Sequence, residues 1–243
     1  MKRFLILTFS LLPILCFAQG VRTQINGKIN FPEYDKSSRL IYFVYQLKDQ
    51  SILDSTWIKN NAFTFNKNLS PNVKVKLLFT KPGTSPNQAA DPNTLNFFVK
   101  EGSVNVDATG YLGRAKVTGV PMQEEYVIFK KVYLKIDTNL RLLGWKKKRT
   151  KATDSLKMKA VDNEIDSVRN AKMKLLVTFL DQNISKPYAP DAIFMYLKAN
   201  GSTLDLAKAE GYFNSLPVEQ QKSADGNDIV KEIADLRKKD KKN

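Results

Sequence analysis

Residues 103–136, SVNVDATGYLGRAKVTGVPMQEEYVIFKKVYLKI, contain the point at which the pattern of apolar residues changes. Before Pro121, apolar and polar residues alternate in short runs, which is the period of strands with one buried face. After Pro121, apolar residues recur at helical spacings, and no further proline occurs before Pro187. The sequence therefore predicts a β-rich region that ends near Val120 and a helical region that follows it.

Upstream of this point, the chain reads as a series of short strands separated by turns. Residues 24–31 alternate between polar and apolar, and residues 39–47 are rich in aromatic and β-branched side chains. A hairpin is expected around Asn60 and Asn61, because asparagine tolerates the left-handed conformation that tight turns require. About seven or eight such strands predict an antiparallel β-sandwich or β-barrel over residues 19–120.

Downstream of Val120, the sequence predicts a helical region over residues 121–243 that begins with a long helical hairpin. The second long helix carries one apolar stripe, with spacings of mostly three and four residues. The stripe consists of Leu156, Val161, Ile165, Val168, Lys172, Leu175 and Phe179. The lysine is expected at the edge of the stripe, where its aliphatic stem can pack. The two helices, joined near residues 145–154, are expected to form an antiparallel pair.

Shorter helices are predicted after this pair, at about residues 190–199, 204–215 and 228–239. Ser202 and Thr203 are expected to cap the second of them. Strands followed by helices place the chain in the α+β class, with the sandwich or barrel first and the helical hairpin and short helices second.

The first eighteen residues have the features of a secretory signal peptide. Lys2 and Arg3 precede an apolar run, and we expect cleavage after Ala18. The mature chain would then lack cysteine and lie in the periplasm or in association with the outer envelope. The alternative is a lipoprotein acylated on Cys16, although Leu15 stands where lipidation normally requires a small residue. No later run is long and apolar enough for a transmembrane segment.

The composition argues against several classes of chemistry. The chain has no histidine and one cysteine, so histidine-based catalysis and the usual zinc, copper and haem ligand sets are not expected. No EF-hand calcium loop, phosphate-binding glycine loop or Gly-x-Ser-x-Gly motif occurs. We therefore predict no cofactor, no metal site and no enzymatic activity. A hydrolase of unrecognised type is the remaining enzymatic alternative.

The formal net charge is +15, and the densest cluster of basic residues is the candidate binding site of the chain. This basic patch consists of Trp145, Lys146, Lys147, Lys148, Arg149 and Lys151. Its cations suit the phosphates of anionic lipid or polysaccharide, and a tryptophan suits the boundary between water and lipid. The simpler interpretation, which we favour, is a solvated connection between the two long helices. Nucleic acid is not an expected partner of an exported protein.

The aromatic residues of the β-rich region are expected in the core of the sheets rather than on a ligand platform. They are Tyr42, Phe43, Tyr45, Trp57, Phe63, Phe65, Phe97 and Phe98. The surface of the long helical pair is another candidate site for docking a protein, but we expect the apolar stripe to be closed by packing within the pair.

Several short motifs occur in a recognisable order along the β-rich region. They are INGKI at 25–29, DS at 54–55, FTF at 63–65, FFVKEG at 97–102 and VTG at 117–119. In this order they resemble the β-rich N-terminal domain of unknown function that precedes the thioredoxin domain in many Bacteroidetes thiol-disulfide oxidoreductases. In the helical region, YAPDAIF at 188–194 and YFNSLP at 212–217 are similar to the helical linker of the same proteins.

The resemblance implies a β-rich fold and a place in the cell envelope, but it does not imply redox activity. Those oxidoreductases continue into a Trp-Cys-x-x-Cys active site, and no such motif occurs up to Asn243. We therefore expect a non-enzymatic, exported binding or accessory module of the envelope. Its expected partner is an envelope protein, with a thioredoxin-like protein in trans as one candidate. The alternative is a basic surface protein that binds anionic envelope components.

Overall fold

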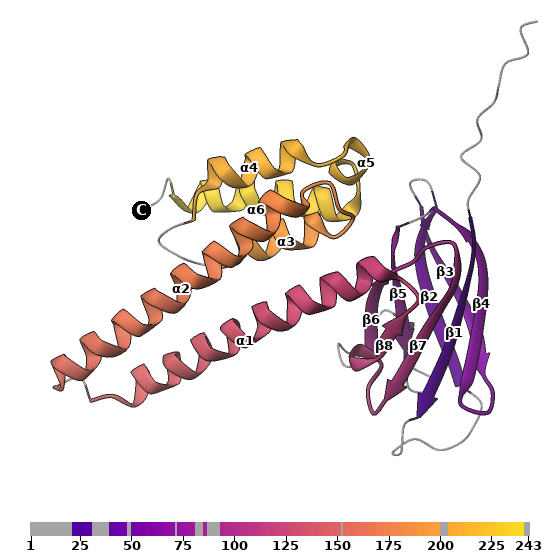
Figure 1. Cartoon of the computed structure of the whole chain (residues 1–243), viewed down its shortest axis with the longest axis horizontal. Coiled ribbons are helices and arrows are strands. Elements are labelled where there is room, and N and C mark those ends of the chain that lie inside the picture. Colours follow the sequence, from indigo (N-terminus) through magenta and orange to yellow (C-terminus); the bar gives the residue numbers. More distant parts are fainter. Residues whose placement is uncertain are drawn as a thin grey trace, which may run out of the picture. The chain divides into compact units, whose positions relative to one another are not determined.

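The computed structural model describes residues 21–30, 39–47, 50–70, 72–80, 85–86, 93–151, 153–199 and 204–240. They belong to two compact units, Met1–Val120 and Pro121–Asn243, whose boundary coincides with the change of apolar period (Figure 1). The described part of the first unit is built from strands, and that of the second is built from helices. The predicted α+β class is confirmed.

Eight strands and a short 3-10 helix are described in the first unit. They are β1 (Val21–Asn30), β2 (Arg39–Leu47), β3 (Gln50–Ile58), β4 (Ala62–Leu69), β5 (Lys74–Phe79), β6 (Thr94–Phe98), β7 (Gly102–Thr109), η3 (Leu112–Arg114) and β8 (Lys116–Thr118). The strands form two four-stranded sheets, in the orders β4-β1-β7-β8 and β3-β2-β5-β6. The sheets do not close into a barrel, so the sandwich is the correct one of the two predicted architectures.

One strand pair departs from the predicted antiparallel arrangement. β1 pairs with β4 antiparallel but with β7 parallel, with Ile25 opposite Val104. The other strand pairs of the two sheets are antiparallel. The parallel pair arises because β1 and β7 are far apart in the sequence, so no short turn imposes opposite directions on them.

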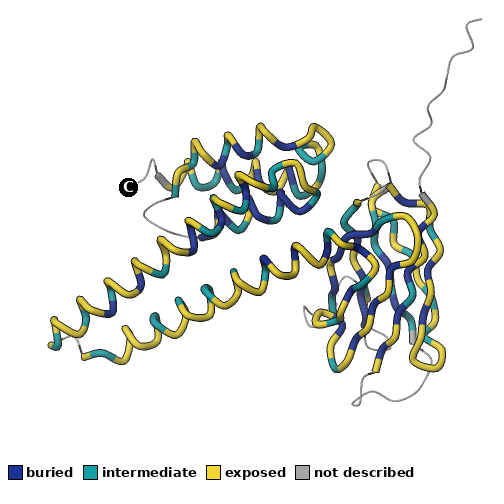
Figure 2. Tube along the Cα trace, viewed as in Figure 1, coloured by how far each residue is buried: buried dark blue, intermediate teal, exposed yellow. Residues whose placement is uncertain are grey.

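The core of the sandwich is built from alternate residues of the strands, as the alternation of buried and exposed positions in Figure 2 shows. Phe43 of β2 and Phe65 of β4 join the two sheets, with ring centroids 5.1 Å apart. Gly27 of β1 leaves space for the ring of Phe63, which a Cβ at this position would overlap. The glycine of the INGKI motif is therefore a packing requirement of the sandwich.

The turn at Asn60 and Asn61 joins strands of different sheets, whereas a hairpin was predicted there. Both residues have positive φ, 52° and 61°, as the sequence predicts for a tight turn. Beyond the bridge between Lys59 and Ala62, however, β3 pairs with β2 and β4 pairs with β1. The turn therefore passes from one sheet to the other, because long-range pairing separates the strands that it joins.

The DS motif at 54–55 lies at an edge of the sandwich. Asp54 of β3 forms an ion pair with Lys67 of β4, and it also accepts a hydrogen bond of 2.7 Å from the backbone N–H of Ser55. The hydrogen bond from Lys67 is the main cause that lowers the pKa of the Asp54 carboxyl. The pair joins an edge strand of one sheet to an edge strand of the other. Charges held at sheet edges also discourage pairing with strands of other chains.

Six helices are described in the second unit. They are α1 (Pro121–Arg149), α2 (Ser155–Asn183), α3 (Ala189–Leu197), α4 (Leu206–Ser215), α5 (Val218–Gln221) and α6 (Ala224–Asp240). α1 and α2 form the predicted antiparallel pair (Figure 1). α2 also packs on α3, which in turn packs on α4 and α6. Of these helices, only the short α5 was not predicted from the sequence pattern.

The caps of two helices come from aspartates. Asp154 precedes α2 and accepts a hydrogen bond of 3.1 Å from the backbone N–H of Lys157. Asp205 plays the same part for α4, with a bond of 3.0 Å from the N–H of Lys208. The predicted caps of α4, Ser202 and Thr203, lie outside the described residues.

Candidate functional site

The basic patch lies at the end of α1 and not in a loop between the two long helices. α1 continues to Arg149, so Trp145 and the four basic residues that follow it occupy its last turns. Lys151 alone lies beyond the helix end. The predicted connection near residues 145–154 is therefore shorter than expected. No residue from 145 to 149 breaks a helix, and basic side chains are favourable near the negative end of the helix dipole.

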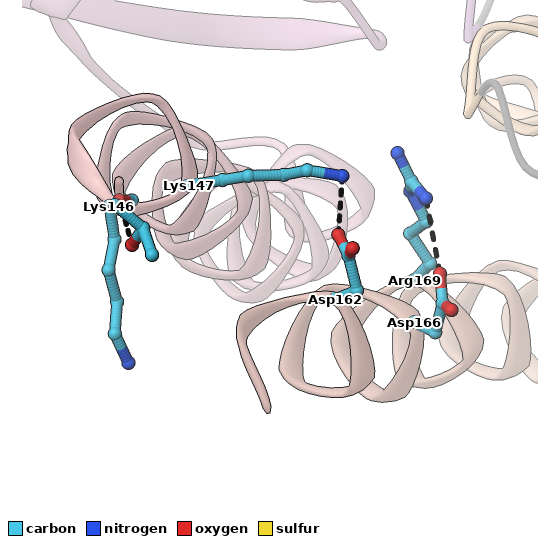
Figure 3. A network of polar contacts seen from close by, with 6 residues as sticks. Lys146, Lys147, Asp162, Asp166 and Arg169 are labelled. Atoms are coloured by element: carbon cyan, nitrogen blue, oxygen red, sulfur yellow. Dashed lines mark hydrogen bonds and ion pairs between the residues drawn. The ribbon is translucent and has the colours of Figure 1, made fainter. Parts of the chain in front are cut away.

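Two lysines of the basic patch are engaged with carboxylates of α2. Lys146 Nζ lies 2.8 Å from Glu164 Oε2, and Lys147 Nζ lies 2.5 Å from Asp162 Oδ1, the contact drawn in Figure 3. Exposed ion pairs of this kind contribute roughly 0 to 1 kcal/mol to stability, but they balance charge locally. The basic members with no ion-pair partner among the residues that the structure describes are Lys148, Arg149 and Lys151.

An open cavity of about 560 Å³ lies beside the patch, between the adjoining ends of α1 and α2. Its lining includes Ile165 and three cations, Lys147, Lys148 and Arg169. Two of its cations face carboxylates, since Lys147 pairs with Asp162 and Arg169 Nη1 lies 3.2 Å from Asp166 Oδ1 (Figure 3). The cavity therefore offers mixed charge and an apolar wall rather than a concentrated anion site.

A further set of exposed side chains extends from the basic patch along α1. This outer stripe consists of Lys131, Leu134, Thr138, Leu142, Trp145 and Arg149. Successive members are three, four, four, three and four residues apart, so they share one face of the helix. All six are exposed, and the exposed fractions of Leu134, Leu142 and Trp145 are 54%, 55% and 61%. Sequence reasoning missed the outer stripe, although its spacing is the same signal that located the apolar stripe of α2.

The opposite side of α1 packs on α2 around aromatic rings and one buried ion pair. Phe129 of α1 stacks on Phe179 of α2, with ring centroids 3.6 Å apart. Lys172 of α2 is 5% exposed, and its Nζ lies 2.7 Å from Asp137 Oδ1 and 4.7 Å from the ring centroid of Tyr133. The predicted place of Lys172 at the edge of the stripe is wrong, because the carboxylate and ring of α1 allow its charge to be buried.

The environment of Lys172 keeps its ammonium group charged. Burial alone would lower its pKa, but the hydrogen bonds with Asp137 and Tyr133 outweigh burial, and the pKa lies above its ordinary value. A lysine that is harder to deprotonate is a poorer nucleophile and a poorer base at neutral pH. The pair is therefore suited to holding the two helices together rather than to chemistry.

Three buried tyrosines of the helical unit donate hydrogen bonds to carboxylates. Tyr126 Oη lies 2.7 Å from Asp191 Oδ2, and Tyr188 Oη lies 3.2 Å from Glu125 Oε2. The third bond joins Tyr212 Oη to Asp181 Oδ1 at 2.6 Å. Burial is the largest cause that raises the pKa of all three hydroxyls, to about 12 for Tyr188, and the carboxylates add to it. Tyr188, Asp191 and Tyr212 belong to the YAPDAIF and YFNSLP motifs, which therefore carry internal contacts of the helical unit.

Two aromatic residues of the sandwich, Trp57 and Tyr42, depart from the predicted core, because both lie on the outer face of the β2–β3 pair. Phe43, Phe63, Phe65, Phe97 and Phe98 are buried as predicted, and Tyr42 and Tyr45 are half-buried. Trp57 of β3 is 53% exposed, so its predicted burial is wrong. It stands opposite Leu40 of β2, and two pairs further along the same face the exposed Leu53 stands opposite Val44. This outer sheet face is an exposed apolar surface of the described part of the sandwich.

Over the described part of the chain, no three acidic, histidine or cysteine side chains come together in a way that would hold a metal ion. None of the helices within the described ranges has both the length and the apolar character that a bilayer span requires.

Residues 23–126 match a family described as a domain of unknown function (DUF4369). The matched segment comprises β1 from Thr23 onward, the strands β2 to β8 and the first residues of α1, and it contains all five motifs of the β-rich region. No curated protein and no solved structure matches the chain. The comparisons therefore support a domain of unknown function as the β-rich part of this protein.

Proposed function

We propose that this chain is a non-enzymatic binding or accessory module of the cell envelope, exported by a signal peptide that is cleaved after Ala18. Support for export comes from the charged and apolar pattern of residues 1–18. Support for a modular role comes from the match of residues 23–126 to a domain of unknown function.

The observation that carries the non-enzymatic part of the proposal is the state of the buried ionisable groups. Perturbed groups mark active sites when the perturbation increases reactivity at the working pH. In the described helical unit, Lys172 and Tyr126 are shifted in the opposite direction, toward tighter retention of the proton. Each is held by a carboxylate within the same unit. These groups are suited to stabilising the unit and not to acid–base or nucleophilic catalysis.

The partner that we propose is an envelope protein of the thioredoxin type, acting in trans. The motifs of the sandwich resemble the domain that precedes a thioredoxin domain in Bacteroidetes oxidoreductases, and the one cysteine of this sequence, Cys16, lies in the proposed signal peptide. A partner would then supply the reactive cysteines. The outer sheet face around Leu53 and Trp57 is the surface that we assign to this contact, because exposed apolar clusters are typical of protein interfaces.

The test is capture of envelope proteins on the immobilised chain that starts at Gln19, washed at low and at high salt and identified by mass spectrometry. We expect a thioredoxin-like protein to remain at high salt on the wild-type chain. It should be lost from Trp57→Ser and kept by Trp145→Ser, a matched change of an exposed tryptophan in the other unit. Two results would contradict the proposal. One is equal retention of the partner by the wild-type chain and by Trp57→Ser, and the other is that no protein remains bound at high salt.

One observation favours a second candidate function, the binding of anionic envelope components. The basic patch continues into the outer stripe of α1, which joins cations to exposed apolar side chains. No observation over the described residues favours the hydrolase alternative.

A further inference from the structure

The outer stripe of α1 is a long helical face whose apolar side chains are exposed to solvent in the described structure. From Lys131 to Arg149 it covers eighteen residue steps, which at about 1.5 Å per residue is roughly 27 Å of helix. Leu134, Leu142 and Trp145 are each more than half exposed along this length. Because the backbone is helical, its polar groups bond within the helix, and the face can enter an apolar boundary without unpaired N–H or C=O groups.

The charge of α1 is strongly asymmetric. The helix contains eight lysines or arginines and three acidic residues. Of these acids, Asp137 binds the buried Lys172, and Glu125 accepts a hydrogen bond from Tyr188 and lies 4.0 Å from Lys186. Asp137 and Glu125 are therefore engaged elsewhere and do not neutralise the stripe.

Four cations lie on or beside the outer stripe and have no ion-pair partner over the described ranges. They are Lys131, Lys135, Arg141 and Arg149. Long basic side chains can direct their charged ends toward phosphate while their stems lie along apolar surface. An anionic occupant is therefore the one that the charge of this face complements.

We propose that the outer stripe of α1 lies on an anionic lipid surface. Leu134, Leu142 and Trp145 enter the headgroup region, and the four cations on or beside the stripe contact lipid phosphates. A helix with a tryptophan and leucines on one face and lysines and arginines around them has the composition of a helix that lies in the plane of a membrane interface. A soluble anion would neutralise the cations but would leave the apolar side chains in water. The inference deepens the second candidate function and does not depend on a thioredoxin-like partner.

The experiment is sedimentation of the chain from Gln19, which contains every described residue, with vesicles of phosphatidylcholine alone or with an added fraction of phosphatidylglycerol. We expect binding to the anionic vesicles and little to the neutral ones. Leu142→Ser/Trp145→Ser should weaken that binding by about tenfold or more, and Lys131→Gln/Lys135→Gln by a similar factor. Each variant is first checked for unchanged helix content by circular dichroism.

Matched control variants distinguish binding through the outer stripe from nonspecific apolar adsorption and from nonspecific electrostatic attraction. Trp57→Ser/Leu156→Ser removes a tryptophan and a leucine that are 53% and 82% exposed elsewhere, and Lys159→Gln/Lys174→Gln removes two exposed charges from α2. We expect both controls to bind within about twofold of wild type, because substitutions at distant sites that share no contacts act independently of the outer stripe. In a Trp57→Phe background, the fluorescence of Trp145 should shift to the blue on addition of anionic vesicles.

Several outcomes would overturn the proposal. They include an equal loss in the control variants, an absence of binding to anionic vesicles, and competition by inorganic phosphate at constant ionic strength, which would point to a soluble anion. Retention of an acidic protein through Trp145, in place of vesicles, would assign the face to a protein. Failure of the Trp57-dependent capture leaves the vesicle result unaffected, so the two proposals fail separately.

Discussion

α1 and α2 are each 29 residues long and pack against each other, but they differ in how much of their surface the fold uses. α2 lies between α1 and α3, and Leu156 is its one large apolar side chain that is exposed in the described structure. α1 exposes Val127, Ile128, Val132, Leu134, Leu142 and Trp145. Their charge differs as well, with eight basic and three acidic residues in α1 against five and four in α2.

The difference separates a structural role from an available surface. α2 covers most of its large apolar residues inside the unit, and its basic and acidic residues nearly balance. Leu156 is the exception, because it is 82% exposed, so its predicted place in the packed apolar stripe is wrong. α1 has one side that is needed for the fold and another that carries apolar and basic side chains without a described internal partner. Three expected results sharpen this contrast.

The largest effect should come from the packed side of α1. Phe129→Ala removes a ring that stacks on Phe179, and we expect it to lower the free energy of unfolding by about 3 to 5 kcal/mol. Val132→Ala, on the exposed side three residues later, should change it by less than about 0.5 kcal/mol. Urea denaturation followed by circular dichroism measures both. Similar losses for the two variants would show that the exposed side is also used by the fold.

The second effect concerns the ion pair between the two helices. Asp137→Ala leaves the buried charge of Lys172 without its carboxylate, and we expect a loss of about 2 to 3 kcal/mol. This is below the usual value for a fully buried pair, because the Asp137 side chain is 43% exposed. Glu164→Ala breaks the exposed pair with Lys146 and should cost at most about 1 kcal/mol. Equal costs in urea denaturation would remove the distinction between the two pairs.

The smallest effect is on the dependence of stability on pH. The pKa of Tyr188 is raised to about 12 by burial and by its bond to Glu125, whereas an unfolded tyrosine titrates near about 10. Between these values the unfolded state has released its proton and the folded state has not, so stability should fall as the pH rises from about 10 to 12. Lys172, whose pKa is also raised, acts in the same direction.

Tyr188→Phe should therefore flatten the decline in stability above pH 10, as measured by thermal unfolding across alkaline pH. Tyr111→Phe is the control, because Tyr111 is exposed and belongs to the other unit. An unchanged slope in Tyr188→Phe would mean that this hydroxyl titrates as it does in the unfolded chain.

The candidate site was only partly predictable from the sequence. The basic patch can be recognised in the sequence as a run of basic residues. The ion pairs of Lys146 and Lys147, however, depend on acidic residues of α2 that the fold brings opposite them. The outer stripe was detectable in principle from its spacing. The face of α1 that is covered could not be predicted from the sequence, because it depends on where α2 packs.

By itself, the sequence determined the features that arise within a short stretch of chain. These are the strand periodicity before Pro121, the helical periodicity after it, and the left-handed turn at Asn60 and Asn61. Such features follow from backbone sterics and from the alternation of apolar side chains, which act over a few residues. They were sufficient for the α+β class and for the point at which strands give way to helices.

Tertiary structure alone decided which elements pair and which charges are buried. It set β1 parallel to β7, carried the Asn60 turn from one sheet to the other, and placed Lys172 against Asp137. Each outcome depends on residues far apart in the chain, and a side chain such as Lys172 has the same local sequence whether or not a carboxylate meets it. Because the free energy of burying a charge is set by that distant partner, only the folded chain determines whether the lysine lies in the core or at the surface.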